Sequence, residues 1–474
     1  MSTPDPKSTP IDPGRRPYGA YYRRFDRDNA KPDPELTQTT AGTPMGEYLR
    51  RHWQPVCLSQ ELTEVPKAIQ IMGEKLIAFR DRSGQVGVME RHCAHRGASL
   101  EYGIIQQKGI RCCYHGWQYD VDGRVLEMPC EPRTSRMKDN TFQGAYPAFE
   151  RDGLVFAYMG PPDEQPEFEV FDAYVMPAGT KLVPFSNVYA CNWLQVYENL
   201  VDHFHAAALH NNMTVDSVDA AIRAGVNLGQ GFFKMPVIQW QATRNGHGMC
   251  FAAGRRVDDE KVWVRITEMQ FPNAVQTASL VPTAAELRHT TVAMTRWQVP
   301  VDDEHMVVFG WRHFNDEIDP GHYGTEADCG IDSIDFLVGQ TAHRSYLEGQ
   351  RAPGDYEAIT SQGPIALHAM ETPARSDVGV YMCRNLLRQA LRGTTTPDTS
   401  RDIARAQREP LPVYTSDSVL AVARRDDVDD NDVLMKIGSQ VLAIMKECDA
   451  VPSAERKTHT RRRLDEIDGG ARRE

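Results

Sequence analysis

Two short stretches decide the fold of the N-terminal part of this chain: residues 93–97, CAHRG, and residues 112–117, CCYHGW. Each stretch offers one thiolate and one imidazole, at Cys-x-His and Cys-x-x-His spacing. A zinc site of the finger type usually takes two cysteines from one loop and two histidines from another. Here the two residue types alternate. Two facing loops would therefore gather both cysteines on one side and both histidines on the other.

This alternation favours a [2Fe–2S] cluster in which Cys93 and Cys112 hold one iron and His95 and His115 hold the other. Imidazole ligands raise the reduction potential of such a cluster well above that of an all-cysteine cluster. The pattern, with its Tyr-His-Gly-Trp continuation, resembles the Rieske cluster motif. Cys113 stands where that motif usually has proline and could compete as a ligand, but the resemblance favours Cys112. A structural zinc site is the alternative.

Bulk composition limits the class of protein. The 474 residues are enough for two domains, and 65 acidic against 53 basic residues give a formal charge of −12. This balance argues against a nucleic-acid or anionic-membrane binder. The sequence has no run of 18 apolar residues and no signal-like N-terminus, so we expect a cytoplasmic protein. Ten cysteines scattered over a long chain do not form a disulfide framework.

The pattern along the chain predicts an α+β protein. Residues 1–42 indicate an N-terminal arm that is extended or disordered, with an aromatic patch at 18–25 that could dock on a neighbouring subunit. Short β-branched runs and turns over 43–160 predict a small antiparallel β-domain that carries the two cluster loops. Longer strands and helical segments over 161–451 predict an antiparallel sheet covered by helices. Residues 452–474 have mixed charge and indicate a frayed tail.

A second informative stretch is residues 198–210, ENLVDHFHAAALH, which contains Asp202, His205 and His210 in an Asp-x-x-His-x4-His arrangement. It resembles the iron-binding segment of Rieske non-haem iron oxygenases, where two histidines and a carboxylate hold Fe(II) with open positions. Five residues span about 140° around an ideal helix, so His205 and His210 cannot share a metal on a regular helix. We therefore predict a π-bulge or distorted turn within 206–209. A histidine-rich amphipathic helix with core histidines is the alternative.

The third iron ligand must come from far along the chain. Residues 353–366 are similar to the stretch that carries it in the family, and Asp355 occupies the matching position. Glu357 is the nearest competitor, and Asp332 and Asp335 are weaker ones.

The resemblance gives further residues in the 198–210 stretch their expected roles. It implies that Asp202 is not a ligand but links His205 to a cluster histidine of the adjacent subunit, and so holds the imidazoles in the required tautomer. Asn199 is expected near the iron, and His203 is expected to be structural.

Over residues 43–395 the chain resembles the large (alpha) subunit of Rieske oxygenases, most closely the phthalate dioxygenase-like group. The resemblance implies a homotrimer, or a stacked hexamer, that receives electrons from NADH or NADPH through a separate reductase, with or without a ferredoxin. It also implies that O2 is used to hydroxylate an aromatic, carboxylated substrate at a mononuclear Fe(II). O-demethylation of a methoxyarene is the alternative reaction. A Rieske electron carrier and a zinc-stabilised interaction protein are the alternatives from other classes of protein.

The substrate cannot be read from any local pattern. A carboxylated substrate would need a basic residue in the pocket. The candidates are Arg244, Arg255, Arg256 and Arg265, each of which the sequence favours as a solvated surface charge.

Overall fold

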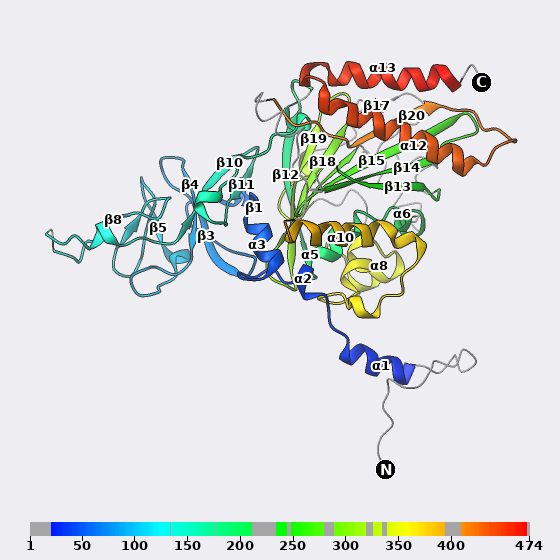
Figure 1. Ribbon diagram of the computed structural model, residues 1–474. Helices are drawn as coiled ribbons and strands as arrows, with labels where there is room; N and C mark the ends of the chain where they lie inside the picture. The colour runs from blue at the N-terminus through cyan, green and yellow to red at the C-terminus, as the bar shows by residue number, and fades with distance from the viewer. Residues whose placement is uncertain are drawn as a thin grey trace, which may run out of the picture.

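The chain folds into a β-rich N-terminal part and a larger part in which helices cover a long sheet, as the α+β prediction required (Figure 1). The structure is a computed structural model. It describes residues 20–132, 134–175, 177–210, 234–243, 248–278, 289–318, 326–333, 339–393 and 409–471.

The β-rich part begins after helix α3 (Pro44–Arg50). The Thr43 hydroxyl accepts a hydrogen bond from the Gly46 N–H and so caps this helix, which has proline at its first position. Two antiparallel sheets follow, in the orders β1-β11-β10 and β2-β3-β4-β9. Their strands are β1 (Gln54–Leu58), β2 (Lys67–Ile71), β3 (Glu74–Arg80), β4 (Val86–Glu90), β9 (Ala145–Tyr146), β10 (Ala148–Arg151) and β11 (Leu154–Ala157).

A third sheet carries the cluster loops and forms the far end of this part of the molecule (Figure 1). Its short antiparallel strands are β5 (Ile104–Ile105), β6 (Ile110–Arg111), β7 (Gln118–Tyr119) and β8 (Val125–Glu127). A small apolar core lies beneath it and includes Ile77, Phe79, Ile110 and Trp117. The core is separate from that of the larger part, so the cluster loops rest on a compact base of their own.

The larger part is built on a nine-stranded antiparallel sheet. Its main path runs β12-β19-β18-β16-β15-β14-β13, and β20 pairs with β15 and β17. The strands are β12 (Lys181–Tyr189), β13 (Val237–Ala242), β14 (Gly248–Arg256), β15 (Lys261–Gln270), β16 (Ala274–Ala278), β17 (His289–Thr290), β18 (Val292–Pro300), β19 (Met306–Phe314) and β20 (Ser416–Ala421).

Helices cover both faces of this sheet (Figure 1). On one face lie α5 (Trp193–Asn199) and α10 (Val378–Leu391), and on the other lie α12 (Asp430–Glu447) and α13 (Ser453–Ala471). All nine residues of β14 are buried, as expected for a strand that is covered on both sides.

Both ends of the described chain are more ordered than the sequence suggested. The frayed C-terminal tail was a wrong prediction, because 453–471 form α13, and Arg456 on it is 7% exposed and pairs with Asp172 at 2.7 Å. At the other end, α1 (Ala20–Asn29) and α2 (Pro34–Thr37) are helical, and the Trp193 indole N–H donates to the Leu36 carbonyl. The mixed-sign charges of these two segments therefore belong to helices with solvated faces, not to disordered tails.

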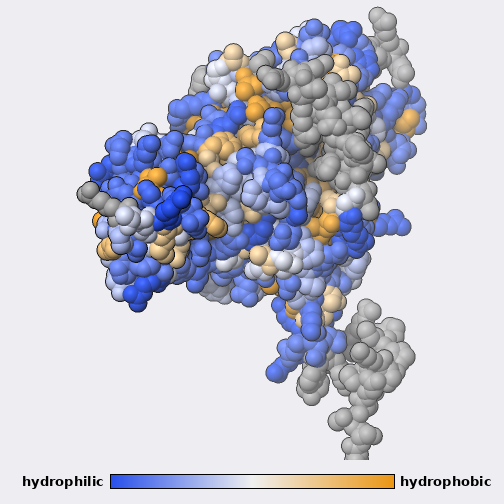
Figure 2. Space-filling view, turned by 60° about the vertical axis from the view of Figure 1, so that its left-hand side comes forward, coloured by the Kyte–Doolittle hydropathy of each residue, from blue (hydrophilic) through white to orange (hydrophobic). Residues whose placement is uncertain are grey.

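The surface that Figure 2 shows is predominantly hydrophilic, with apolar residues scattered in small groups. In the described part of the chain, every helix is too short or too polar to cross a lipid bilayer.

Candidate functional site

The two cluster loops face each other at the tip of the third sheet. Cys93 and Cys112 are each 3% exposed and belong to the apolar core, whereas the two histidines stand at the surface edge. The imidazole rings of His95 and His115 lie 4.5 Å apart, centroid to centroid. The structure thus separates cysteines from histidines in the way that the alternating spacing predicted.

Several side chains that the sequence analysis missed hold these loops. The Gln143 amide accepts from the Ala94 N–H and donates to the carbonyls of Glu90 and His92. The Tyr119 hydroxyl lies 2.9 Å from the Cys93 sulfur. Residues of this kind orient ligands from outside the ligand set, and no local pattern in the sequence identifies them.

Backbone geometry closes both loops. Gly97 and Gly116 each adopt φ of +73°, a conformation that L side chains rarely adopt, and Arg111 donates to the Gly116 carbonyl. Trp117 stacks on the His95 ring with centroids 4.4 Å apart.

The four residues fit a His-ligated [2Fe–2S] cluster. The His95 Nδ1 is buried and makes no hydrogen bond, so it is free to act as a ligand. Burial, and then the neighbouring Cys93, raise the pKa of the Cys112 thiol, because two thiols are gathered in an apolar site. Cys113 is exposed, so the structure favours Cys112 over Cys113.

The second site forms between two helices and a distant loop. Helix α5 ends at Asn199, the chain turns through 200–203, and α6 (Phe204–Leu209) then carries His205. His205 Nε2 lies 3.4 Å from one carboxylate oxygen of Asp355, and His210 Nε2 lies 3.5 Å from the other. One potential ligand atom from each of these residues lies within 4.8 Å of the others, so they can share one metal ion.

The predicted distortion within 206–209 was wrong. These residues form a regular α-helix, which ends at Leu209, and His210 follows as its C-terminal cap. The break falls earlier, between α5 and α6, and the two imidazole centroids are 5.5 Å apart. The helix positions of His205 and His210 diverge, but the side chains reach a common point, because the Nε2 atoms of both lie within 3.5 Å of the Asp355 carboxylate.

Asp355 is the carboxylate that the fold brings to this pair of histidines. It begins helix α9 (Asp355–Thr360) and is 6% exposed. Asn199 donates to one of its oxygens at 3.4 Å and Gln340 to the other at 3.1 Å. Burial alone raises the pKa of Asp355. His210 and His205, together with the hydrogen bonds from Gln340 and Asn199, more than offset this effect, so the pKa lies below its ordinary value. The deprotonated carboxylate, which is the form that binds a metal ion, is therefore favoured.

The competing carboxylates have other partners. Glu357 accepts from the Gly354 N–H at 2.8 Å and pairs with Arg344. Asp332 accepts from the Val188 N–H and pairs with His343. Asp335 lies outside the described residues.

Asp202 stands at the start of α6. Its Oδ1 accepts from the Phe204 N–H at 2.8 Å, and its Oδ2 lies 3.8 Å from the His205 Nδ1, a buried atom that makes no hydrogen bond. Asp202 therefore caps the helix and faces the side of His205 that points away from the metal position. His203 packs edge-on against Phe251.

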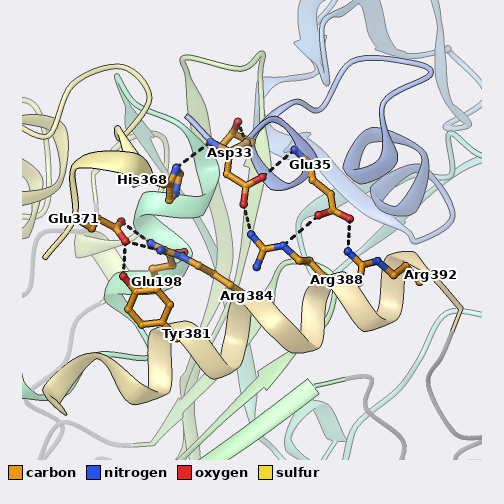
Figure 3. Close-up of polar contacts among 10 residues, drawn as sticks. Asp33, Glu35, Glu198, His368, Glu371, Tyr381, Arg384, Arg388 and Arg392 are labelled. Carbon is orange, nitrogen blue, oxygen red and sulfur yellow. Dashed lines mark hydrogen bonds and ion pairs between the residues drawn. The ribbon is translucent and has the colours of Figure 1, made fainter. Parts of the chain in front are cut away.

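A buried ionic cluster fixes the helix that precedes the second site (Figure 3). Arg384 on α10 donates from its Nε and from one terminal nitrogen to the two carboxylate oxygens of Glu198 on α5, at 2.5 and 2.7 Å. Its other terminal nitrogen donates to Glu371. The Glu198 backbone carbonyl accepts from Val201 and Asp202, so this arginine anchors the turn that leads to Asp202. The same helix holds the N-terminal arm, where Arg388 pairs with Asp33 and Glu35.

A cavity of about 100 Å³ opens beside the metal-site residues. Apolar side chains such as Phe185, Met294 and Val308 line it, together with the three residues of the candidate metal site and a few polar groups.

The arginines of the sheet are not the solvated surface charges that the sequence favoured. Arg255, Arg256 and Arg265 are 1%, 9% and 2% exposed. Arg244 lies outside the described residues. The cavity is lined by Arg265 and by Arg296, which the sequence analysis did not consider because a single arginine in a strand gives no signal.

Comparison with known protein families divides the chain in the same way. A model described as the Rieske [2Fe-2S] domain matches residues 52–143, and one described as LigXa C-terminal domain like matches residues 157–327.

Individual relatives extend the likeness over nearly the whole chain. The tert-butanol monooxygenase / tert-amyl alcohol desaturase oxygenase subunit of Aquincola tertiaricarbonis is 61% identical over 450 residues, which are 94% of this chain and 96% of that protein. The phthalate 4,5-dioxygenase oxygenase subunit of Pseudomonas putida is 31% identical, over 75% of this chain and 84% of that protein.

Among solved structures, the terminal oxygenase of carbazole 1,9a-dioxygenase from Novosphingobium sp. KA1 shares the fold, with a TM-score of 0.52 and 20% identity over 80% of this chain and 100% of that chain. Both candidate iron sites, both family models and the long alignments indicate the same family. The chain is a member of the Rieske non-haem iron oxygenases, an oxygenase component of the phthalate dioxygenase-like group with a Rieske [2Fe–2S] cluster and a mononuclear Fe(II).

Proposed function

We propose that this protein is the oxygenase component of a system that oxidises a small tertiary alcohol at the mononuclear iron site. The observation that carries the proposal is the convergence of His205, His210 and Asp355 beside a small, mainly apolar cavity. Fe(II) held by two imidazoles and one carboxylate keeps positions open for O2.

The size of the cavity supports a small substrate. Its volume of about 100 Å³ is below the roughly 150 Å³ of an engineered cavity that binds benzene. The relative from Aquincola tertiaricarbonis, 61% identical, is named for tert-butanol and tert-amyl alcohol. This substrate class differs from the aromatic acid that the sequence analysis expected.

The proposed reaction balances with O2 and two electrons from NAD(P)H, delivered through a separate reductase. A methyl C–H bond of tert-butanol breaks and a C–O bond forms. One oxygen atom of O2 enters the product diol and the other leaves as water, with two protons consumed. Desaturation of tert-amyl alcohol uses the same electrons, removes two hydrogens from the substrate and releases both oxygen atoms as water.

We assign the electron path to Cys93, Cys112, His95 and His115 as cluster ligands and to Asp202 as the link toward His205. In one chain the cluster loops and α6 lie toward opposite ends of the molecule (Figure 1). This separation supports electron transfer from the cluster of one subunit to the iron of the next, as in the expected homotrimer.

Hydroxylation of an aromatic acid is the second candidate. The phenoxybenzoate dioxygenase subunit alpha of Ectopseudomonas oleovorans is 34% identical over 76% of this chain, and a relative at 29% identity is named as a 5,5'-dehydrodivanillate O-demethylase oxygenase subunit. O-demethylation therefore remains within the second candidate.

The test is turnover under ¹⁸O2 by the iron-loaded protein with a surrogate reductase. The proposal expects a diol from tert-butanol that carries one ¹⁸O atom, detected by mass spectrometry. Products from phthalate, phenoxybenzoate or a methoxyarene, with none from either alcohol, would support the second candidate and overturn the first.

A further inference from the structure

One cationic side chain in the iron cavity lacks a counter-ion among the residues that the structure describes. Arg296 on β18 lines the cavity, and one of its terminal nitrogens donates to the Thr277 hydroxyl at 3.3 Å. Its Nε is buried and makes no hydrogen bond. Burial lowers the pKa of Arg296 to about 10, so the guanidinium is still charged at neutral pH.

Two buried arginines of the same domain are neutralised by carboxylates. Arg265 pairs with Asp417 at 2.7 Å, and Arg256 pairs with Asp430 at 2.7 Å. Within the described ranges, Arg296 has no carboxylate at ion-pair distance. The charged or ionisable groups that influence it most are Tyr189 and Asp355, and the latter is already engaged by two histidines and two amides.

A half-buried guanidinium with a buried, unsatisfied Nε and no counter-ion among the described residues is costly, and its position at the wall of a substrate cavity indicates where the missing acceptor comes from. We propose that Arg296 holds the oxygen function of the substrate. For a tertiary alcohol, the guanidinium donates to the hydroxyl oxygen. The alkyl groups then lie against apolar residues that line the cavity, such as Phe185 and Met294.

This assignment rests on the proposed function and adds a determinant of specificity. A site that donates a hydrogen bond to a substrate oxygen rejects an analogue that lacks that oxygen, because the donor is then left unpaired. Tert-amyl alcohol and 2,2-dimethylbutane have nearly the same shape, with a hydroxyl in one where the other has a methyl group. The wild-type protein should therefore prefer the alcohol strongly.

The experiment compares wild type, Arg296→Met and Arg296→Lys as iron-loaded full chains, with Arg312→Met as the matched control. Arg312 lies on the neighbouring strand β19 and stacks on Phe314, and it does not line the cavity. The KM for tert-amyl alcohol, its Kd measured calorimetrically without O2, and the Kd of 2,2-dimethylbutane are determined for each protein.

We expect Arg296→Met to raise both the KM and the Kd for the alcohol by about tenfold or more, because the variant loses one charge-assisted hydrogen bond to the substrate. Its preference for the alcohol over the alkane should largely disappear, while its iron content stays at the wild-type level. Arg296→Lys should recover part of the affinity, and Arg312→Met should behave as wild type.

Two outcomes separate the inference from the proposed function. If wild type oxidises the alcohol and Arg296→Met does so with the same KM and the same preference, the assignment of Arg296 is overturned and the function stands. If wild type oxidises neither alcohol but binds benzoate, and Arg296→Met loses that binding, the proposed substrate is overturned and the role of Arg296 as the receptor for a substrate oxygen stands.

Discussion

The two candidate iron sites are built in opposite ways. The cluster residues come from two loops within 25 residues of each other, and their backbone is closed by glycines at positive φ. The mononuclear site joins His205 and His210 to Asp355, about 150 residues further along the chain, and lies between helices inside the domain. The histidines of the first site stand at the surface edge, whereas His210 and Asp355 are 5% and 6% exposed.

This difference corresponds to the two tasks. A cluster that exchanges electrons with a partner benefits from histidines at the surface, while a site that handles O2 and substrate benefits from a small cavity with few polar groups. The cluster site depends on local turns, and the iron site depends on long-range packing such as the Arg384–Glu198 contact. Matched pairs of variants can test whether each site depends on the residues assigned to it.

The largest effect is expected at the cluster. Cys112→Ser should abolish the cluster absorbance and reduce oxygenase turnover to background, because no electrons reach the mononuclear iron. Cys113→Ser is the matched control, since the neighbouring thiol is exposed and should leave both cluster and turnover intact. Loss of the cluster in Cys113→Ser, with retention in Cys112→Ser, would reverse the assignment.

At the second site, Asp355→Ala should remove the mononuclear iron and leave the cluster unchanged. Iron content should fall from about three to about two per chain, with acid-labile sulfide constant. Glu357→Gln provides the control, because Glu357 lies two residues away but caps the start of α9. If Glu357→Gln lost the iron and Asp355→Ala kept it, the third ligand would be wrongly assigned.

A smaller effect is expected at Asp202, the proposed link between the two sites. Asp202→Asn keeps an oxygen that can cap α6 but removes the negative charge beside His205. Re-oxidation of the reduced cluster in a single turnover should slow by about 10–100-fold, the usual effect of losing a residue that orients a metal ligand. The control measurement is iron content, which should not change. An unchanged re-oxidation rate would contradict the proposed link.

Much of the fold could be predicted from the sequence because it follows local patterns. The small β-domain over 43–160 and a sheet covered by helices over 161–451 were predicted from β-branched runs, turn residues and helical segments. The cluster loops were apparent because four potential ligands of two residue types, at fixed spacing, are locally encoded. The resemblance to a known family supplied Asp355, which spacing alone could not.

The errors arose where tertiary structure decides. The break between α5 and α6 falls before His205 rather than within 206–209, because Asp202 caps a new helix there. The helix α13 and the buried arginines have partners far along the chain, such as Asp172 for Arg456 and Asp417 for Arg265. Those pairings exist only once the domain has folded, and so a charged residue in the sequence gives no sign of them.

The most direct test is a crystal structure of the iron-loaded protein with anomalous scattering recorded at the iron and zinc edges. We expect a two-iron peak among Cys93, Cys112, His95 and His115, and a single iron peak shared by His205, His210 and Asp355. A zinc signal in place of the cluster, or a single-iron peak away from His205, His210 and Asp355, would contradict this expectation.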